Sequence, residues 1–260
     1  MKKEWPYIEE PTYHSHPANG SSDIKTAYKS IYEYYLSKFG PPRHHEPTGS
    51  MTLGSVVDCM VTEPDKFDER FVVLDKGERK AHGEKRDVIR QTGAQGYESA
   101  LAMKKALADS KIARKIFDFD AINCERQASR FATVCGVEAK CRCDVLHAEY
   151  CVDLKTTVDA SPTAFGRQAI RFGYHMQAEW YRRILRATGH EISRFYFVVV
   201  QSSWPWTVGC YTLPANAQLF AKQQVDEACE KIKTALETSC FDTELMTDVV
   251  TLNTPDFLFN

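Results

Sequence analysis

The chain has neither an excess of one charge nor a long hydrophobic segment. Its 260 residues include 33 Lys and Arg against 35 Asp and Glu, so the formal net charge is −2. This balance excludes a polybasic protein that binds nucleic acid through bulk charge, and an anionic partner would have to meet a local basic patch. No apolar run approaches the roughly 18 residues of a membrane helix, and residues 1–16 do not resemble a signal peptide. We therefore expect a cytoplasmic protein without a membrane partner.

The nine cysteines show no CxxC pair of the kind that marks many zinc sites. Their odd number leaves at least one cysteine unpaired within the chain, and most of them lie in apolar, strand-like segments. We interpret them as buried free thiols in a reducing compartment, in preference to metal or cluster ligands.

The spacing of apolar residues predicts an α/β fold with a mixed central sheet flanked by helices. Helical spacing covers residues 24–39, 53–63, 97–117, 163–187 and 215–238, and strand-like alternation covers residues 122–134, 137–146, 150–157, 194–201 and 207–213. Residues 1–20 have little periodicity and are expected to form a loosely held arm, and residues 241–260 form a tail without a clear pattern. Since no linker or repeat interrupts the chain, we expect a single domain over residues 1–260.

Residues 76–90 are polar and rich in basic side chains. They contain glycines but no apolar stripe, so we interpret them as a mobile loop that runs into a helix. The basic side chains would either lie on a solvated face or face phosphate groups, and the sequence leaves both possibilities open.

Two neighbouring predicted strands, residues 137–146 and 150–157, carry the side chains of greatest chemical interest. Alternation places four residues of the first strand towards the core (Ala139, Cys141, Cys143 and Val145) and four charged residues on its other face (Glu138, Lys140, Arg142 and Asp144). Asp153 and Lys155 share a face of the second strand. The short connection between the strands predicts a hairpin, which would bring Asp144, Asp153 and Lys155 together.

Paired carboxylates beside a lysine suit the metal-assisted hydrolysis of phosphodiesters. Two adjacent carboxylates repel each other unless a cation lies between them, and hard oxygen ligands favour Mg²⁺ or Mn²⁺. A lysine two residues after one carboxylate can orient the attacking water and neutralise phosphate charge. A surface strand with an internal ion pair is the alternative, and the D-x-K spacing alone does not separate the two.

The helix expected over residues 163–187 would present one stripe of side chains to the sheet. Tyr174, Gln177 and Tyr181 are spaced at i, i+3 and i+7. The tyrosines also fit core packing, whereas Gln177 is better explained by a role in holding a phosphate or the attacking water. Arg167 and Arg171 lie one turn apart and would contact phosphates or stay on a solvated surface.

The combined pattern resembles the PD-(D/E)XK nucleases, in particular the RecB-like group that has a QxxxY helix. The matching residues are Asp144, then DLKTT from Asp153, then Gln177 and Tyr181. Within that group, the segments KCRCD, VDLKTTVDAS and GYHMQAEWY are similar to the C-terminal nuclease of RecE (exonuclease VIII) and its phage relatives. The similarity is strongest over residues 120–205 and stays in register over residues 21–64. It implies a restriction-endonuclease-like core.

This resemblance implies a nuclease that degrades double-stranded DNA from its ends in the 5′→3′ direction. The product would be a 3′ single strand for recombination, passed to an annealing partner of the RecT kind. The resemblance also implies that Asp144, Asp153 and the Leu154 carbonyl bind Mg²⁺, with Mn²⁺ as a plausible substitute. Lys155 would position the attacking water.

The same resemblance assigns supporting roles to other side chains and implies an assembly. Gln177 and Tyr181 would support the site and the substrate. From their charge and position, and not from the resemblance, Arg142, Arg167 and Arg171 are expected to face the DNA phosphates as parts of a basic rim. By analogy, the protein would form a homo-oligomeric ring that encloses DNA.

One position departs from the family pattern. Many relatives carry a metal-binding His in a G-x-x-x-H pattern of the second helix, where this chain has Gly54 followed by Asp58. A carboxylate is a harder ligand than imidazole, so Asp58 could bind Mg²⁺ in place of the His. The alternatives are that Asp58 marks an altered second metal position or lies on the helix surface without a function. Glu125 is a further acidic candidate with little support from the sequence.

Two other functions stay open. A non-catalytic module that binds DNA ends would keep the fold, with Asp58 marking a drifted site. The second is a nuclease of different polarity or role, such as one that acts on single strands or one of the CRISPR-adaptation type. Some related nucleases hold an iron–sulfur cluster with a C-terminal cysteine triplet, and the wide spacing of Cys210, Cys229 and Cys240 predicts no such cluster here.

Overall fold

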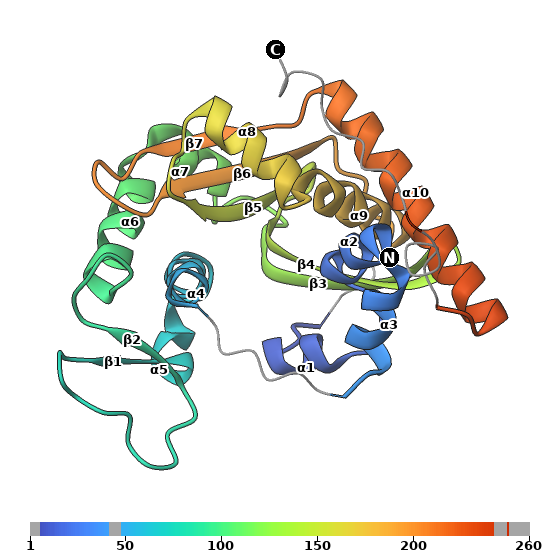
Figure 1. Ribbon diagram of the computed structural model, residues 1–260. Coiled ribbons are helices and arrows are strands. Elements are labelled where there is room, and N and C mark those ends of the chain that lie inside the picture. Colours follow the sequence, from blue (N-terminus) through green and yellow to red (C-terminus); the bar gives the residue numbers. More distant parts are fainter. Residues whose placement is uncertain (1–5, 42–47, 242–248, 250–260) are drawn as a thin grey trace.

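A five-stranded mixed sheet flanked by helices lies at the centre of the computed structural model, which describes residues 6–41, 48–241 and 249 (Figure 1). The helices are α1 (Glu10–Ser15), α2 (Ser21–Lys29), α3 (Ile31–Phe39), α4 (Gly49–Thr62), the 3-10 helix η1 (Pro64–Lys66), α5 (Phe67–Arg70), α6 (Tyr97–Asp109), α7 (Lys111–Phe117), α8 (Pro162–Arg171), α9 (Tyr174–Ala187) and α10 (Ala215–Thr238). The strands are β1 (Phe71–Leu74), β2 (Asp87–Arg90), β3 (Glu125–Val134), β4 (Val137–Leu146), β5 (Tyr150–Thr157), β6 (Arg194–Gln201) and β7 (Val208–Tyr211).

The sheet has the order β3-β4-β5-β6-β7. Its neighbours are antiparallel except for β5 and β6, which pair in parallel along the whole of β5. A parallel pair needs a long crossover, and here the chain makes it through α8 and α9. The crossover holds α9 against one face of the sheet, where Trp180 and Ile184 are fully buried.

Two hydrophobic cores lie on opposite faces of the sheet. The first packs α2, α9 and α10 against β3 to β6, and the second packs α4, α6 and α7 against β4 to β6. The prediction of buried free thiols is confirmed for five of the cysteines, whereas two others are exposed: Cys59, Cys141, Cys143, Cys151 and Cys229 are buried, and Cys135 and Cys240 are exposed.

The predicted strands and the last helix agree with the structure, but the helix expected over residues 163–187 is divided in two. Gly173 separates α8 from α9 with a left-handed φ of 66°. A Cβ at this position would lie 2.6 Å from Cδ of Lys25. The backbone angle therefore favours glycine at this joint, and a side chain here would also have to displace that of Lys25.

Two further predicted helices are also divided, each at a serine. Ser30 ends α2 and begins α3, where its side chain accepts a hydrogen bond from the Glu33 amide. Ser110 does the same between α6 and α7 through the amide of Ala113. Each serine accepts a hydrogen bond from a free amide group and thereby caps the start of a new helix. The spacing of apolar residues continues across both breaks, so it predicted one helix where the structure has two.

The prediction that residues 76–90 run into a helix is wrong. Asp87–Arg90 forms β2, which pairs in parallel with β1, and Ile89 is buried in the second core. The helix α6 begins only at Tyr97. Between the two strands, four basic side chains are exposed: Lys76, Arg79, Lys80 and Lys85.

The first 20 residues are not loosely held as far as the structure describes them, from residue 6. Nζ of Lys140 donates hydrogen bonds to three carbonyls of this arm, those of Tyr13, His14 and His16, at 2.7–3.2 Å. Asn19 exchanges backbone hydrogen bonds with β4. The arm therefore covers the charged face of β4. Its low periodicity did not predict this, because the contacts are made by backbone carbonyls and do not depend on apolar side chains.

The expected tail, residues 241–260, lies outside the described residues except for Phe241 and Val249. Within the described part of the chain, no helix combines the length and the apolar character needed to cross a membrane.

Candidate active site

Five elements, α4, β4, β5, α8 and α9, contribute residues to one cleft of about 730 Å³. Helix α4 supplies one wall, β4 and β5 supply the floor, and α9 supplies the opposite wall. Seven of the residues selected from the sequence line this cleft: Asp58, Asp144, Asp153, Leu154, Lys155, Gln177 and Tyr181. The convergence expected from the hairpin is therefore present in the structure.

The cleft opens where β4 and β5 separate. The two strands pair only at Val145 with Val152 and at Leu146 with Cys151. Beyond that point, Oδ2 of Asp144 accepts a hydrogen bond from the backbone amide of Leu154 at 2.6 Å. A side chain thus replaces a ladder partner, and the separated strands leave room for a ligand between them.

Asp153 is held from two sides. Its Oδ1 accepts a hydrogen bond from Nε2 of Gln177 at 2.7 Å, and its Oδ2 lies 2.5 Å from Nζ of Lys155. Nζ of Lys155 also lies 4.9 Å from the centre of the Tyr174 ring. Burial opposes the charged form of Lys155, but the carboxylates of Asp153 and Asp144 outweigh it and raise the pKa of this lysine. The ammonium group therefore stays charged beside the carboxylates.

Asp58 enters the cleft from α4 with one oxygen held and one not. Its Oδ2 accepts a hydrogen bond from Nε2 of Gln127 at 2.9 Å, whereas its buried Oδ1 has no hydrogen-bond partner. Burial, together with repulsion by nearby carboxylates that include Asp153, raises the pKa of Asp58 to about 7. Burial and repulsion by Asp58 and Asp153 likewise raise the pKa of Asp144 well above its usual value.

These donors fit a hard divalent cation. The raised pKa values of Asp58 and Asp144, to which the Asp153 carboxylate contributes, and a buried carboxylate oxygen without a partner are the situation that a bound Mg²⁺ or Mn²⁺ would relieve. Among the described residues, no three His, Cys, Asp or Glu side chains are already arranged as a complete metal site. Asp153 would have to exchange a present contact, with Gln177 or Lys155, for the metal.

Comparison with known proteins identifies the family. The family described as "PDDEXK-like domain of unknown function (DUF3799)" matches residues 20–243. The chain belongs to this PDDEXK-like family. Its fold is the restriction-endonuclease-like α/β fold that the sequence predicted. No curated protein is significantly similar to the chain in sequence.

A solved structure agrees with this assignment of the fold. A protein from Eubacterium rectale, described as a putative exonuclease, superposes with a TM-score of 0.65 at 15% identity, over 96% of this chain and 96% of that chain. A second structure, that of SSO0001, has a TM-score of only 0.31 at 13% identity, over 81% of this chain and 85% of that chain. At these identities the likeness concerns the fold alone.

The PDDEXK-like domain does not place Arg142 on a basic rim, contrary to the expectation from strand alternation. Arg142 is buried, with Nε donating to Oε1 of Gln127 at 2.8 Å and Nη1 donating to the carbonyl of Ile8 at 2.5 Å. The N-terminal arm covers this face of β4, so a phosphate contact by Arg142 is excluded in this conformation.

Three other candidates also lie outside the cleft of the PDDEXK-like domain. Arg167 and Arg171 are exposed on α8, whose C-terminal end leads to Phe172 on the cleft wall. Glu125 pairs with Arg130 at 2.6 Å and does not line the cleft. A direct role of Glu125 in metal binding is therefore not supported, and phosphate contacts by the two arginines stay a prediction.

Two residues near the cleft were missed by the sequence reasoning. Gln127 contacts Asp58 from β3, where a polar residue within an alternating strand gives no functional signal. Lys25 of α2 approaches the cleft wall, and its Nζ donates to the carbonyl of Phe172 at 3.4 Å. Burial, reinforced by the nearby charge of Lys155, lowers the pKa of Lys25 to about 8.

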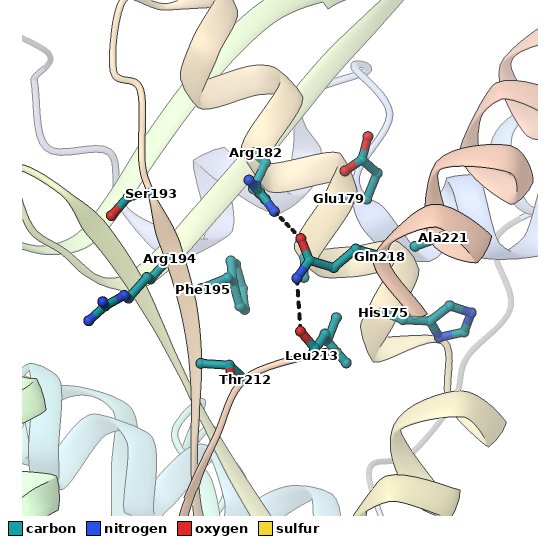
Figure 2. A pocket seen from close by; sticks show the side chains of 11 residues that line it. His175, Glu179, Arg182, Ser193, Arg194, Phe195, Thr212, Leu213, Gln218 and Ala221 are labelled. Atoms are coloured by element: carbon teal, nitrogen blue, oxygen red, sulfur yellow. Dashed lines mark hydrogen bonds between the residues drawn. The ribbon is translucent and has the colours of Figure 1, made fainter. Parts of the chain in front are cut away.

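A second, smaller cavity of about 180 Å³ lies on another face of α9 (Figure 2). It is lined by His175 and Arg182, which belong to a different helical stripe from Gln177 and Tyr181. Nη1 of Arg182 donates to Oε1 of Gln218, whose Nε2 donates to the Leu213 carbonyl. Its polar groups hold one another, so this cavity offers no comparable chemistry.

Proposed function

We propose that this chain is a metal-dependent nuclease that hydrolyses the phosphodiester bonds of DNA. The observation that carries the proposal is the meeting of Asp144, Asp153 and Lys155 in one cleft, with Gln177 holding Asp153 from α9. Without a cation, such a cleft would repel phosphate. With one, the same groups become a site for an anionic ester.

The residues of the cleft would have different roles in hydrolysis. A divalent cation held by Asp58, Asp144, Asp153 and the Leu154 carbonyl would supply Lewis acidity and neutralise phosphate charge. Lys155 stays protonated, so it would orient the attacking water and bind a phosphate oxygen.

Side chains of α9 would position these groups. Gln177 fixes the rotation of the Asp153 carboxylate through Oδ1. Tyr181 is buried at the wall of the cleft and would support the site and the substrate.

The finer assignment is a Mg²⁺-dependent exonuclease that digests double-stranded DNA in the 5′→3′ direction. It is supported by the RecE-like segments and by the description of the Eubacterium rectale protein. The 3′ single strand would serve recombination through an annealing partner of the RecT kind, and a homo-oligomeric ring would keep the enzyme on DNA. The exposed Arg167 and Arg171 of α8 are suited to hold phosphates beside the cleft.

The proposal is tested with linear and covalently closed circular duplex DNA in Mg²⁺ and in EDTA. We expect digestion of the linear DNA in Mg²⁺ only, with the closed circle spared. Release of label from 5′-labelled ends before 3′-labelled ends would support the polarity, and the reverse order would contradict it. DNA binding without cleavage in Mg²⁺ or Mn²⁺ would favour a non-catalytic end-binding module.

The role of Lys155 is tested by Lys155→Met. We expect cleavage to fall by about 10²–10⁴-fold in a variant that circular dichroism shows to be folded, because the side chain acts on the water and the phosphate. Lys105→Met is the matched control, since Lys105 is an exposed lysine of α6 paired with Asp109. Wild-type cleavage by Lys155→Met would refute the proposed mechanism.

A further inference from the structure

We propose that Gln127 is a positioning residue for Asp58, which aims the free oxygen of this carboxylate at a divalent cation in the cleft. The inference rests on the proposed function, since it concerns a metal at the same site. Asp58 lines the cleft, its Oδ2 is held by Gln127, and its Oδ1 is buried without a hydrogen-bond partner. Oδ1 is therefore the oxygen left for a ligand in the cleft.

The amide of Gln127 has a single orientation that satisfies its surroundings. Nε2 donates to Oδ2 of Asp58 and to Oγ1 of Thr62, both at 2.9 Å, and Oε1 accepts from Nε of Arg142 at 2.8 Å. A flipped amide would place its oxygen against the Asp58 carboxylate and its N–H groups against a guanidinium. Both N–H groups and the carbonyl are thus used, which fixes the rotation of the Asp58 carboxylate.

Arg142 anchors this amide to the rest of the molecule. Its Nη1 donates to the carbonyl of Ile8 and to Oγ of Ser129, so the guanidinium is held by the N-terminal arm and by β3. The chain of contacts runs from the arm through Arg142 and Gln127 to Asp58. This arrangement explains why a buried arginine lies on the strand that also carries Asp144.

The backbone at Gln127 has an unusual conformation beside Asp58 and Asp144. Its φ of 47° is left-handed, an unfavourable value for a residue with a side chain, in the interior of β3. The ladder between β3 and β4 pairs Arg126 with Val145 and Ala128 with Cys143 but omits Gln127 and Asp144. Strain of this kind persists where the surroundings impose it, and here it adjoins two of the proposed metal ligands.

The alternation of β4 changes at the same point. Cys143 packs in the core beside α9, but Val145 packs in the core beside α4, although the sequence places both on one face. The distortion therefore alters which way Asp144 and its neighbours point. A purely structural Gln127 would leave metal affinity unaffected, which separates the two roles experimentally.

The experiment measures Mn²⁺ binding by isothermal titration calorimetry with the full chain freed of metal. We expect Gln127→Met to weaken the Mn²⁺ affinity about tenfold or more, as loss of an outer-shell partner does, and Asp58→Asn to weaken it at least as much. Gln224→Met is the matched control: Gln224 is a buried glutamine of α10 that bonds to His175 and does not line the cleft. It should bind Mn²⁺ like the wild type.

Melting temperature and near-UV circular dichroism show whether each variant keeps the fold. If Gln127→Met does not fold, Gln127→Asn keeps the amide but is one methylene too short to reach Asp58, and it should show the same loss. Wild-type affinity in a folded Gln127 variant would overturn the positioning role while the proposed nuclease stands. A wild-type chain that binds no Mn²⁺ would overturn both.

Discussion

The buried carboxylates make a specific prediction about the stability of the metal-free protein. The pKa of Asp58 is raised to about 7 by burial and by repulsion from carboxylates such as Asp153. Asp58→Asn removes this charge but leaves an oxygen that can accept the hydrogen bond from Gln127. The variant isolates the cost of a negative charge at this position.

The sign follows from proton binding. Between the ordinary pKa of an aspartate and pH 7, the folded protein holds a proton on Asp58 that the unfolded chain has lost, so raising the pH favours unfolding. Between about pH 5 and about pH 8 the free energy of unfolding should fall by about 3 kcal/mol, because each of the two pH units below the raised pKa contributes about 1.4 kcal/mol. Asp144 adds to the fall in the same direction.

Urea unfolding in EDTA, followed by tryptophan fluorescence, measures this decrease at several pH values. In Asp58→Asn the decrease should be smaller by roughly the contribution of Asp58, and more so because Asp144 loses one of its two repulsive neighbours. Asp109→Asn, at an exposed site on α6, should keep the wild-type fall. Equal decreases in the wild type and in Asp58→Asn would refute the electrostatic reasoning. Mg²⁺ added at the high-pH end should restore wild-type stability by binding the folded state.

Two further predictions concern parts of the molecule away from the cleft. Lys140→Met should lower the free energy of unfolding by about 3 kcal/mol in urea, because it leaves the arm carbonyls of Tyr13, His14 and His16 without a charged donor; an unchanged midpoint would show that the arm is held by other interactions. Replacing the exposed Lys76, Arg79 and Lys80 by Ala should reduce the salt dependence of duplex binding, measured by fluorescence anisotropy. The slope of log K against log salt concentration should fall by about 0.9 for each DNA phosphate that the variant no longer neutralises. An unchanged slope would exclude this loop from the DNA interface.

Periodicity predicted those elements whose burial decides their form. The strands from residue 122 onwards and the helix over residues 215–238 follow the sequence closely, because both faces of the sheet are covered and each face selects apolar residues. The predicted hairpin also gave the proximity of Asp144, Asp153 and Lys155, although the alternation of β4 changes between Cys143 and Val145. The stripe of Gln177 and Tyr181 on one helix required only helical geometry.

Interactions between distant segments were not accessible in this way. Gly173 interrupts a helical pattern with a left-handed φ, and the side chain of Lys25, distant in the sequence, lies against it. Arg142 is covered by the N-terminal arm, so it is buried where the pattern predicted contact with solvent or phosphate. Gln127 is joined to Asp58 across 69 residues. Each of these three environments is made by a distant segment that packs against the residue, and the local sequence contains no information about that segment.

The positions of the basic residues change how the net charge of −2 relates to DNA binding. Lys140 and Arg142 bind the arm, so they add nothing to the attraction of phosphate. With the carboxyl groups ionised, the cleft holds three carboxylates against Lys155, a formal charge of 1 − 3 = −2, which one divalent cation brings to zero. A phosphate would therefore enter the cleft only together with the metal, whereas the exposed cations of α8 and of the loop before β2 would hold the duplex outside. On this reasoning, metal removal should prevent cleavage more completely than it prevents DNA binding.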